Sequence, residues 1–398
     1  MAQIRVALAQ LNVTVGDIDG NADKIVQWTR HGAERGAHLV AFPEMALVGY
    51  PVEDLALRRS FVDASQAAIG KLATRLAEEG LGETVVVVGY LDRAFGPAMG
   101  TDRLGRPKGS PVNAAAVIHG GRIVGRYAKH HLPNYGVFDE YRHFVPGDTL
   151  LVVRVHGVDV AITICEDMWQ DGGPVAATRE AGAGLLLVIN SSPYEANKDD
   201  VRGDLARRRA REAGCTLAYV NLVGGQDELV FDGDSLITDA EGEIFARAPQ
   251  FDAGGMVVDL ELPAAGDPPP AEGAGMAIEH VVIHDEPLPA YEPVPPVHAP
   301  RLSDEAEIYA ALVTGLRDYV AKNGFKSVLL GLSGGIDSCL TAAIACDAIG
   351  AEHVYGISNP SVYSTEHSKD DAAELAARTG LNYRVVPIQP MVQPFLDT

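Results

Sequence analysis

Three side chains that could together break a carbon–nitrogen bond each follow a predicted strand: Glu44, Lys129 and Cys165. A cation beside a thiol favours the thiolate, and a carboxylate can take its proton, so the sulfur could attack an amide carbon. Lys129 and the backbone N–H of Glu166 would donate to the oxyanion, Glu44 would return the proton to the leaving ammonia, and Glu140 would orient Lys129. A lone cysteine is more often inert core packing, so this prediction requires that the three residues meet.

The segments before these residues have the patterns of strands. Residues 158–164 (VDVAITI) form a predicted buried strand that ends at Cys165, and 38–42 is apolar up to Pro43-Glu44. Residues 114–119 and 122–132 form a predicted hairpin around Gly120-Gly121, which carries Lys129 toward its far end. Together with the intervening helical segments, these strands predict a mixed domain with two sheets and helices outside them.

A second candidate site lies in GLSGGIDS. A strand predicted at 325–330 runs into this glycine-rich turn, and a helix follows it. Backbone amides of such a turn and of a helix N-terminus cradle anions, although the alternative is an ordinary glycine-rich turn. Gly-Lys-Ser/Thr is absent, which excludes a Walker loop. We predict phosphate binding, with Mg²⁺ on Asp337. The predicted loop residues are Gly331, Leu332, Ser333, Gly334, Gly335, Ile336, Asp337 and Ser338.

Composition divides the chain into three parts. A domain is predicted over 1–264, a proline-rich linker over 265–301, in which 281–284 could be a last strand of the first domain, and a second domain over 302–398. Ser303 caps the first helix of the second domain. Its strand-helix alternation predicts half of a doubly wound parallel sheet, which is short for such a domain. We therefore expect the chain to be a truncated piece of a longer protein.

Charge and cysteine usage bound the partners. The formal net charge of −22 argues against nucleic acid and anionic membrane as partners. We expect the run Arg207–Arg209 to be a solvated helix face. No apolar run is long enough to span a membrane, and no secretion signal is visible. The four cysteines show no CxxC spacing, so a reducing cytoplasmic location is expected.

Several segments of the sequence resemble two known families. FPEMALVGYP, YAKHHLPNYGVFDEYRHF and ITICEDMW resemble the nitrilase superfamily of carbon–nitrogen hydrolases, whose fold is an αββα sandwich. GLSGGIDS and the later NPSVYSTEHS resemble the NAD synthetase branch of the ATP-pyrophosphatases, whose domain is adenine nucleotide alpha-hydrolase-like. The pairing covers essentially the whole chain and is similar to the glutamine-dependent NAD⁺ synthetase family.

The resemblance implies roles for matching positions. Glu44 would be the proton acceptor, Lys129 the oxyanion-stabilising lysine and Cys165 the nucleophile. The implied glutamine-binding residues are Tyr135, Ser192, Lys198 and Glu166, and residues 331–338 are the implied ATP loop. L-glutamine would be hydrolysed in the first domain, and its ammonia would aminate deamido-NAD⁺ that ATP has activated in the second. A homo-oligomer is also expected, because nitrilase-like assemblies bury helices between subunits.

Two features of the sequence bear on the second domain. Ser361 is followed by Val362 where the family commonly has arginine, which removes a charge near the nucleotide site. The family's dinucleotide-binding positions lie beyond Thr398, so we expect glutaminase chemistry and the ATP loop in this chain, without NAD⁺ synthesis. The alternatives are a hydrolase of another small amide and a nucleotide-sensing module without turnover.

Overall fold

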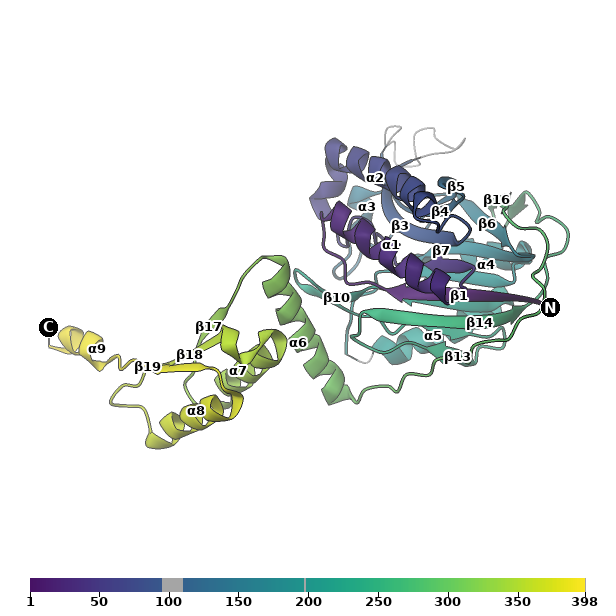
Figure 1. Ribbon diagram of the computed structural model, residues 1–398. Helices are drawn as coiled ribbons and strands as arrows, with labels where there is room; N and C mark the ends of the chain where they lie inside the picture. The colour runs from purple at the N-terminus through teal and green to yellow at the C-terminus, as the bar shows by residue number, and fades with distance from the viewer. Residues whose placement is uncertain (95–109, 197, 398) are drawn as a thin grey trace. The chain divides into compact units, whose positions relative to one another are not determined.

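A computed structural model describes residues 1–94, 110–196 and 198–397, without the side chains of 198 and 199 (Figure 1). The chain divides into two compact units. The first comprises residues 1–224 and 231–302, and the second comprises residues 225–230 and 303–398.

One sheet of the first unit contains, among the described residues, six strands. In spatial order they are β14 (Gly254–Leu262), β1 (Ala2–Gln10), β2 (Leu39–Ala41), β3 (Val85–Arg93), β4 (Pro111–His119) and β5 (Arg122–Ala128). β1, β2 and β3 are parallel, whereas β14, β4 and β5 pair antiparallel with their neighbours. The predicted hairpin with a Gly120-Gly121 turn is therefore confirmed as β4 and β5.

The other sheet contains eight strands within the described parts of the chain. In spatial order they are β13 (Ile244–Arg247), β12 (Leu236–Thr238), β9 (Thr216–Asn221), β8 (Leu185–Asn190), β7 (Val158–Ile164), β6 (Thr149–Val155), β16 (Met276–Val282) and β15 (Glu272–Gly273). The central strands β7, β8 and β9 are parallel, mostly apolar and buried along almost their whole length, as expected of strands covered on both sides.

The two sheets pack face to face, because alternate side chains of each strand point inward. Ile4, Val6 and Leu8 of β1 share one buried core with Val160 and Ile162 of β7. The outer faces carry helices (Figure 1). These are α1 (Ile18–Glu34) and α2 (Arg59–Glu78) on the first sheet, and α4 (Gly173–Glu180) and α5 (Lys198–Ala213) on the second. The predicted αββα sandwich is confirmed.

Shorter helical segments lie at the edge of the sandwich where several strands end. They are the 3₁₀ helices η1 (Glu53–Leu57) and η2 (Cys165–Met168) and the single-turn helix α3 (Glu140–His143).

The proline-rich segment that follows β14 packs along the first unit. Its β16 pairs parallel with β6, so the strand expected at 281–284 exists but begins earlier, at Met276. Farther along, Tyr291 Oη and the Val294 N–H donate to the Asp259 carboxylate, at 2.8 and 2.6 Å. Residues 297–299 then bond to the backbone of Arg247 at the edge of β13.

The second unit is built on three parallel strands within its described residues: β17 (Val328–Gly331), β18 (Val354–Ser358) and β19 (Asn382–Val385). Its helices are α6 (Asp304–Lys322), α7 (Ile336–Ile349), α8 (Glu366–Thr379) and α9 (Gln389–Leu396), with η3 (Ala351–His353) between α7 and β18. Ser303 caps α6 through its side chain, as predicted. Residues 225–230 form the tip of the hairpin β10 (Val223–Gln226) and β11 (Leu229–Asp232).

Candidate active site and nucleotide site

Three strand ends bring Glu44, Lys129 and Cys165 together. β2 precedes Glu44, β5 precedes Lys129, and β7 runs directly into Cys165. The side chains are buried, with 0%, 1% and 5% of each residue exposed. The six-stranded sheet supplies the carboxylate and the ammonium, and the eight-stranded sheet supplies the thiol. The site thus lies where the ends of both sheets meet.

Glu44 is held by three donors. Its Oε1 accepts from Lys129 Nζ at 2.8 Å and from Asn113 Nδ2 at 2.6 Å, and its Oε2 accepts from the Ser191 N–H at 2.9 Å. Gly89 of β3 permits this placement, because a Cβ there would lie 2.3–2.6 Å from backbone atoms of residues 43–45. Asn113 was not predicted; a buried amide within the apolar strand PVNAAAVIH was the available signal.

Lys129 lies between two carboxylates. Besides Glu44, its Nζ donates to Glu140 Oε1 at 3.0 Å, and Tyr50 Oη donates to the same oxygen at 3.1 Å. Burial alone would lower the pKa of Lys129, but Glu140 and Glu44 raise it well above its usual value, so the ammonium stays charged. Burial raises the pKa of Glu140 to about 7; Lys129 opposes this shift and Glu44 adds to it.

Cys165 has an uncommon backbone conformation for a side chain that is not glycine, with φ at +47° at the first residue of η2. Such conformations are concentrated at functional sites, where surrounding contacts hold them in place. Burial raises the pKa of its thiol well above the usual value, the charge of Glu44 adds to this, and Lys129 opposes it. The resting side chain is therefore a thiol, and it must lose its proton during attack.

Asp167 ties the cysteine turn to the lysine strand, although the sequence did not single it out. Its Oδ2 accepts from the Ile164 N–H at 2.9 Å and from Tyr127 Oη at 2.7 Å. Its Oδ1 accepts from the backbone N–H groups of His130 and His131, at 3.1 and 2.8 Å. The carboxylate is fully buried and joins the residues next to Cys165 and Lys129.

The residues predicted to hold glutamine fall into three situations. Tyr135 is about half exposed, and its hydroxyl donates to Glu166 Oε2 at 2.8 Å, so the structure brings these two together. The charge of Glu166 also raises the pKa of the Cys165 thiol. Ser192 is buried just after β8, one residue from the Ser191 N–H that binds Glu44. Lys198 begins α5, and its side chain lies outside the described residues.

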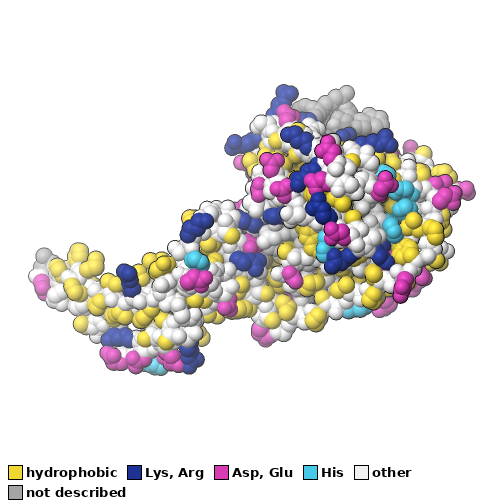
Figure 2. Space-filling model, in the orientation of Figure 1, with side chains coloured by type: hydrophobic (Ala, Val, Ile, Leu, Met, Phe, Trp, Pro, Cys, Tyr) yellow, Lys and Arg dark blue, Asp and Glu magenta, His cyan; other side chains and the backbone are white. Residues whose placement is uncertain are grey.

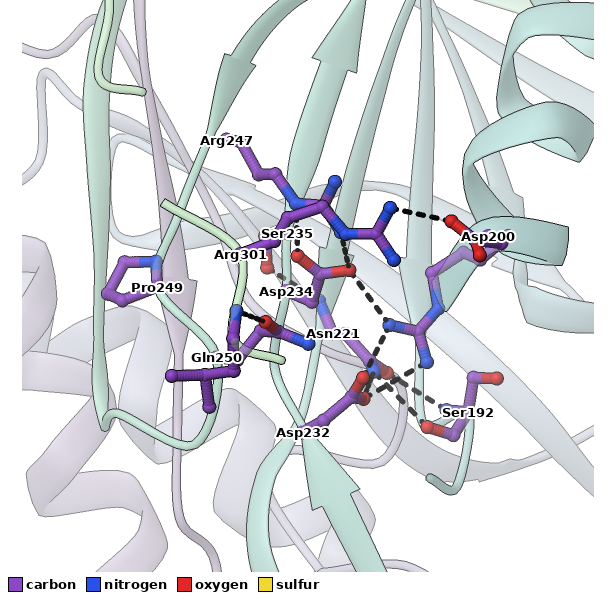
Figure 3. Close-up of polar contacts among 12 residues, drawn as sticks. Ser192, Asp200, Asn221, Asp232, Asp234, Ser235, Arg247, Pro249, Gln250 and Arg301 are labelled. Carbon is purple, nitrogen blue, oxygen red and sulfur yellow. Dashed lines mark hydrogen bonds and ion pairs between the residues drawn. The ribbon is translucent and has the colours of Figure 1, made fainter. Parts of the chain in front are cut away.

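A buried polar network supports the Ser192 segment (Figure 3). Asn221 accepts from the Ser192 N–H at 2.9 Å and donates to its carbonyl at 3.2 Å. Behind it, Arg202 of α5 donates to both oxygens of Asp232, at 2.8 and 3.0 Å, and contacts Asp234 at 3.4 Å. Arg247 binds both oxygens of Asp234 at 2.6 and 2.7 Å. Charges that are fully buried in this way require such pairing.

The expectation that Arg207–Arg209 form a solvated helix face was wrong for Arg209. Only 1% of its side chain is exposed. Its guanidinium donates to the Met168 carbonyl at 2.6 Å and to the Trp169 carbonyl at 3.2 Å. These carbonyls belong to the turn that starts at Cys165, so Arg209 supplies hydrogen-bond donors to this turn.

The glycine-rich loop of the second unit has the conformation that its residues require. Gly334 has φ at +85°, and a Cβ there would lie 1.9 Å from the Ser368 carbonyl oxygen. Ser333 Oγ accepts from the Gly335 N–H at 3.2 Å, and Ser338 Oγ accepts from the Ser333 N–H at 3.3 Å. The loop joins β17 to α7 and is thus fixed by its own hydroxyl groups.

A cavity of about 450 Å³ adjoins this loop. Gly331, Leu332, Ser333 and Gly335 line it, whereas the other four predicted loop residues lie outside its lining. Residues that the site prediction did not include complete the lining: Ile357, Ser358, Asn359, Pro360, Tyr363, Ser364, Thr365, Ser368 and Lys369. Asp337 lies exposed in the first turn of α7. Cavities of this size accommodate small molecules and cofactors.

No helix within the described ranges is long and apolar enough to cross a membrane. On the face seen in Figure 2, acidic and basic side chains are interspersed, without one large patch of either sign.

Two family models match the chain. The carbon-nitrogen hydrolase model matches residues 5–267, and the NAD synthase model matches residues 308–398. The fold and the two matches together identify the first unit as a carbon–nitrogen hydrolase domain and the second unit as a segment of an NAD synthase domain. A glutamine-dependent NAD⁺ synthetase from Thermotoga maritima is 39% identical over 100% of this chain and 67% of that protein. One from Aquifex aeolicus is 40% identical, over 99% and 67%. The chain belongs to the glutamine-dependent NAD⁺ synthetase family, and it spans about two thirds of the length of these relatives.

Solved structures agree with this assignment. Glutamine-dependent NAD⁺ synthetase from Acinetobacter baumannii in complex with ADP has a TM-score of 0.82 and 35% identity, covering 99% of this chain and 66% of that one. An amidase from Nesterenkonia sp. AN1 has a TM-score of 0.53 and 26% identity, covering 66% of this chain and 91% of that one. That amidase structure shows the acetamide moiety of fluoroacetamide added covalently at its active-site cysteine.

Proposed function

We propose that the first unit hydrolyses L-glutamine, with Cys165 as nucleophile, Glu44 as the carrier of its proton and Lys129 as oxyanion donor. The observation that supports this most directly is the buried contact of Lys129 with Glu44 and Glu140 beside a cysteine at positive φ. The covalent adduct on the cysteine of the related amidase supports the role of Cys165.

The proposed reaction begins as Glu44 takes the thiol proton while Sγ bonds to the amide carbon. The raised pKa of Cys165 makes this transfer concurrent with attack, since little thiolate exists beforehand. Lys129 and the Glu166 backbone N–H stabilise the oxyanion. The carbon–nitrogen bond then breaks as Glu44 returns the proton to the leaving ammonia. Water attacks the thioester with Glu44 as base, which releases glutamate and restores the thiol.

Substrate selection would fall to the residues around this centre. We propose that Tyr135, Glu166, Ser192 and Lys198 hold the α-amino and α-carboxylate groups of glutamine. The contact between Tyr135 and Glu166 and the support of Ser192 by Asn221 favour preformed contacts of this kind. A hydrolase of another small amide would not need these four polar residues. The family match disfavours that alternative and also the nucleotide-sensing module without turnover.

We propose that the second unit binds ATP through residues 331–338 and that ammonia from glutamine serves the amidation of deamido-NAD⁺ in the whole enzyme. The cavity beside the loop and the ADP complex of the relative support this proposal. Mg²⁺ prefers carboxylate oxygen, and the exposed Asp337 carboxylate has no ion-pair partner among the described residues, so Asp337 fits that ion. When bound, Mg²⁺ would neutralise phosphate charge.

Val362 removes the charge that the family commonly places near the nucleotide. The side chain of Val362 is largely exposed, and the residue lies outside the cavity lining. Lys369 of α8 does line the cavity, and its Nζ is paired with Glu366 at 2.8 Å. We therefore propose that Lys369 exchanges this surface partner for a phosphate when nucleotide binds.

The test of the glutaminase is glutamate release from L-glutamine by the purified chain and its Cys165→Ala variant. We expect activity to fall by about 10⁴-fold or more, as for other covalent nucleophiles. Cys215→Ala is the matched control, because Cys215 is also a buried thiol of the first unit whose pKa burial raises, to about 12. Retained activity in Cys165→Ala would contradict the proposal. Size measurement of the same preparation tests the expected homo-oligomer.

A further inference from the structure

A cluster of metal-ligating side chains lies at the surface of the first unit, outside the residues discussed so far. Glu83 precedes β3, His119 ends β4, and His284 follows β16. Each offers one ligand atom, and the three atoms lie within 4.8 Å of one another. We propose that Glu83, His119 and His284 form a site for a divalent transition metal of the Zn²⁺ class.

Two histidine nitrogen atoms of the cluster form no hydrogen bond within the described parts of the chain. His119 Nε2 and His284 Nδ1 are buried and have no hydrogen-bond partner among the described residues. A buried polar atom without a partner is costly, and each one in a native structure needs an explanation such as an ion or water. The two rings meet edge to face, with centroids 4.9 Å apart. A metal bound between them would satisfy both nitrogens at once.

The ligand set selects the kind of metal. Two imidazoles and one carboxylate suit Zn²⁺ and its neighbours better than Mg²⁺ or Ca²⁺, which prefer oxygen alone. Tetrahedral Zn²⁺ with bonds of about 2.0–2.1 Å needs ligand atoms about 3.3 Å apart. The cluster must contract slightly, and Glu83 can do this because its side chain is exposed. Water would occupy the fourth position.

Neighbouring rings fix the orientation of His284. His156 stacks on it with centroids 4.1 Å apart and an interplanar angle of 3°, and His38 meets His156 edge to face at 5.1 Å. Such outer contacts hold ligands ready for binding.

The place of the cluster in the fold gives the proposed metal its role. Glu83 and His119 belong to the margin of the six-stranded sheet, whereas His284 follows the β16 strand of the eight-stranded sheet. A bound ion would join the two sheets through side chains 165 residues apart in sequence, from His119 to His284. An ion that binds only the folded state stabilises it in proportion to its affinity and concentration. The proposed ion is structural, so glutamine hydrolysis should not require it.

The test uses the chain without a histidine tag, stripped of metal with a chelator and titrated with Co²⁺ in place of Zn²⁺. We expect one equivalent to bind with the visible bands of tetrahedral Co²⁺ and without sulfur-to-metal charge transfer. Zn²⁺ should raise Tm by several degrees. His284→Ala and Glu83→Gln should each weaken binding by about 100-fold or more, since even outer contacts are worth 10–100-fold.

His353→Ala is the matched control, because His353 is an exposed histidine of the second unit and should leave binding unchanged. Glu83→Gln changes an exposed side chain, so it should fold even where His284→Ala does not. Failure of Co²⁺ to bind, equal affinity in Glu83→Gln and the unchanged chain, or a thiolate spectrum from Cys165 would each overturn the proposal. Glutamate release measured in parallel separates this result from the proposed glutaminase.

Discussion

Replacement of Asp167 by asparagine should damage the proposed active site without removing any proposed substrate contact. The carboxylate accepts four hydrogen bonds, two on each oxygen. If the asparagine oxygen keeps the His130 and His131 N–H groups, its NH₂ group faces Tyr127 and the Ile164 N–H. The tyrosine hydroxyl can rotate to accept, but the Ile164 N–H then faces another donor.

The expected cost follows from these contacts. A hydrogen bond to a charged acceptor contributes about 1.5–3 kcal/mol, and a buried N–H without a partner costs about 1–3 kcal/mol. Asp167→Asn should therefore lower the free energy of unfolding by about 2–4 kcal/mol. Because Ile164 immediately precedes Cys165, a shift of about 1 Å in the sulfur should lower kcat by about 10²-fold. KM should change much less, since Tyr135 and Ser192 are untouched.

Two measurements check this prediction: urea unfolding, and steady-state glutamate release with kcat and KM resolved. Tyr127→Phe is the matched control, because it removes one donor to Asp167 Oδ2 and leaves the three backbone N–H groups bound. Tyr127→Phe should lower both the free energy of unfolding and kcat by less than Asp167→Asn does. An Asp167→Asn variant with unchanged stability and unchanged kcat would refute the assigned role of this carboxylate.

Three further predictions concern the other charged groups. Ionised Glu140 competes for the ammonium that Glu44 binds and so frees Glu44 to accept the thiol proton. The ratio kcat/KM should therefore rise with pH through the raised pKa of Glu140, about 7, and Glu140→Gln should flatten this rise; an unchanged pH profile in the variant contradicts this. Arg202→Met leaves Asp232 buried without its main partner and should lower the free energy of unfolding by about 3–5 kcal/mol in urea unfolding, and a cost below 1 kcal/mol would exclude the network as a support. Asp337→Asn should weaken ATP binding about tenfold in calorimetry with Mg²⁺ and little without it, while glutamate release stays unchanged; equal loss in both conditions argues against a metal role.

The strand pattern was enough to predict that Glu44, Lys129 and Cys165 lie close together. Glu44, Lys129 and Cys165 each follow an apolar run that forms a strand. Because strand ends meet at one edge of such a fold, this local pattern also predicts which distant residues lie together. Asn113 and Asp167 escaped prediction for the opposite reason. Their partners are 69 and up to 40 residues away, and no local pattern states which distant N–H or carboxylate a side chain will meet.

The charge pattern misled at Arg209, and the proline pattern did not show which contacts the linker makes. Arg209 lies in a run of arginines that reads as solvated, yet tertiary structure places it against the carbonyls of the cysteine turn. The segment 283–302 is rich in proline, as flexible or extended connections are. The N–H groups of Val294 and Ala299 nevertheless find acceptors on Asp259 and Arg247, and a sequence cannot show that such acceptors will be nearby.

The protonated, buried state of Cys165 has a consequence for chemical damage. Peroxide and simple alkylating agents react with thiolate that is both ionised and accessible. The resting thiol of Cys165 is neither ionised nor accessible, because it is buried and because burial and the charge of Glu44 raise its pKa. In the proposed mechanism the sulfur becomes reactive only when a carbonyl group reaches Lys129, which would limit modification of Cys165 to molecules that resemble the proposed substrate. An electrophile built on a glutamine skeleton should label it selectively, whereas an oxidising environment alone should leave it largely intact.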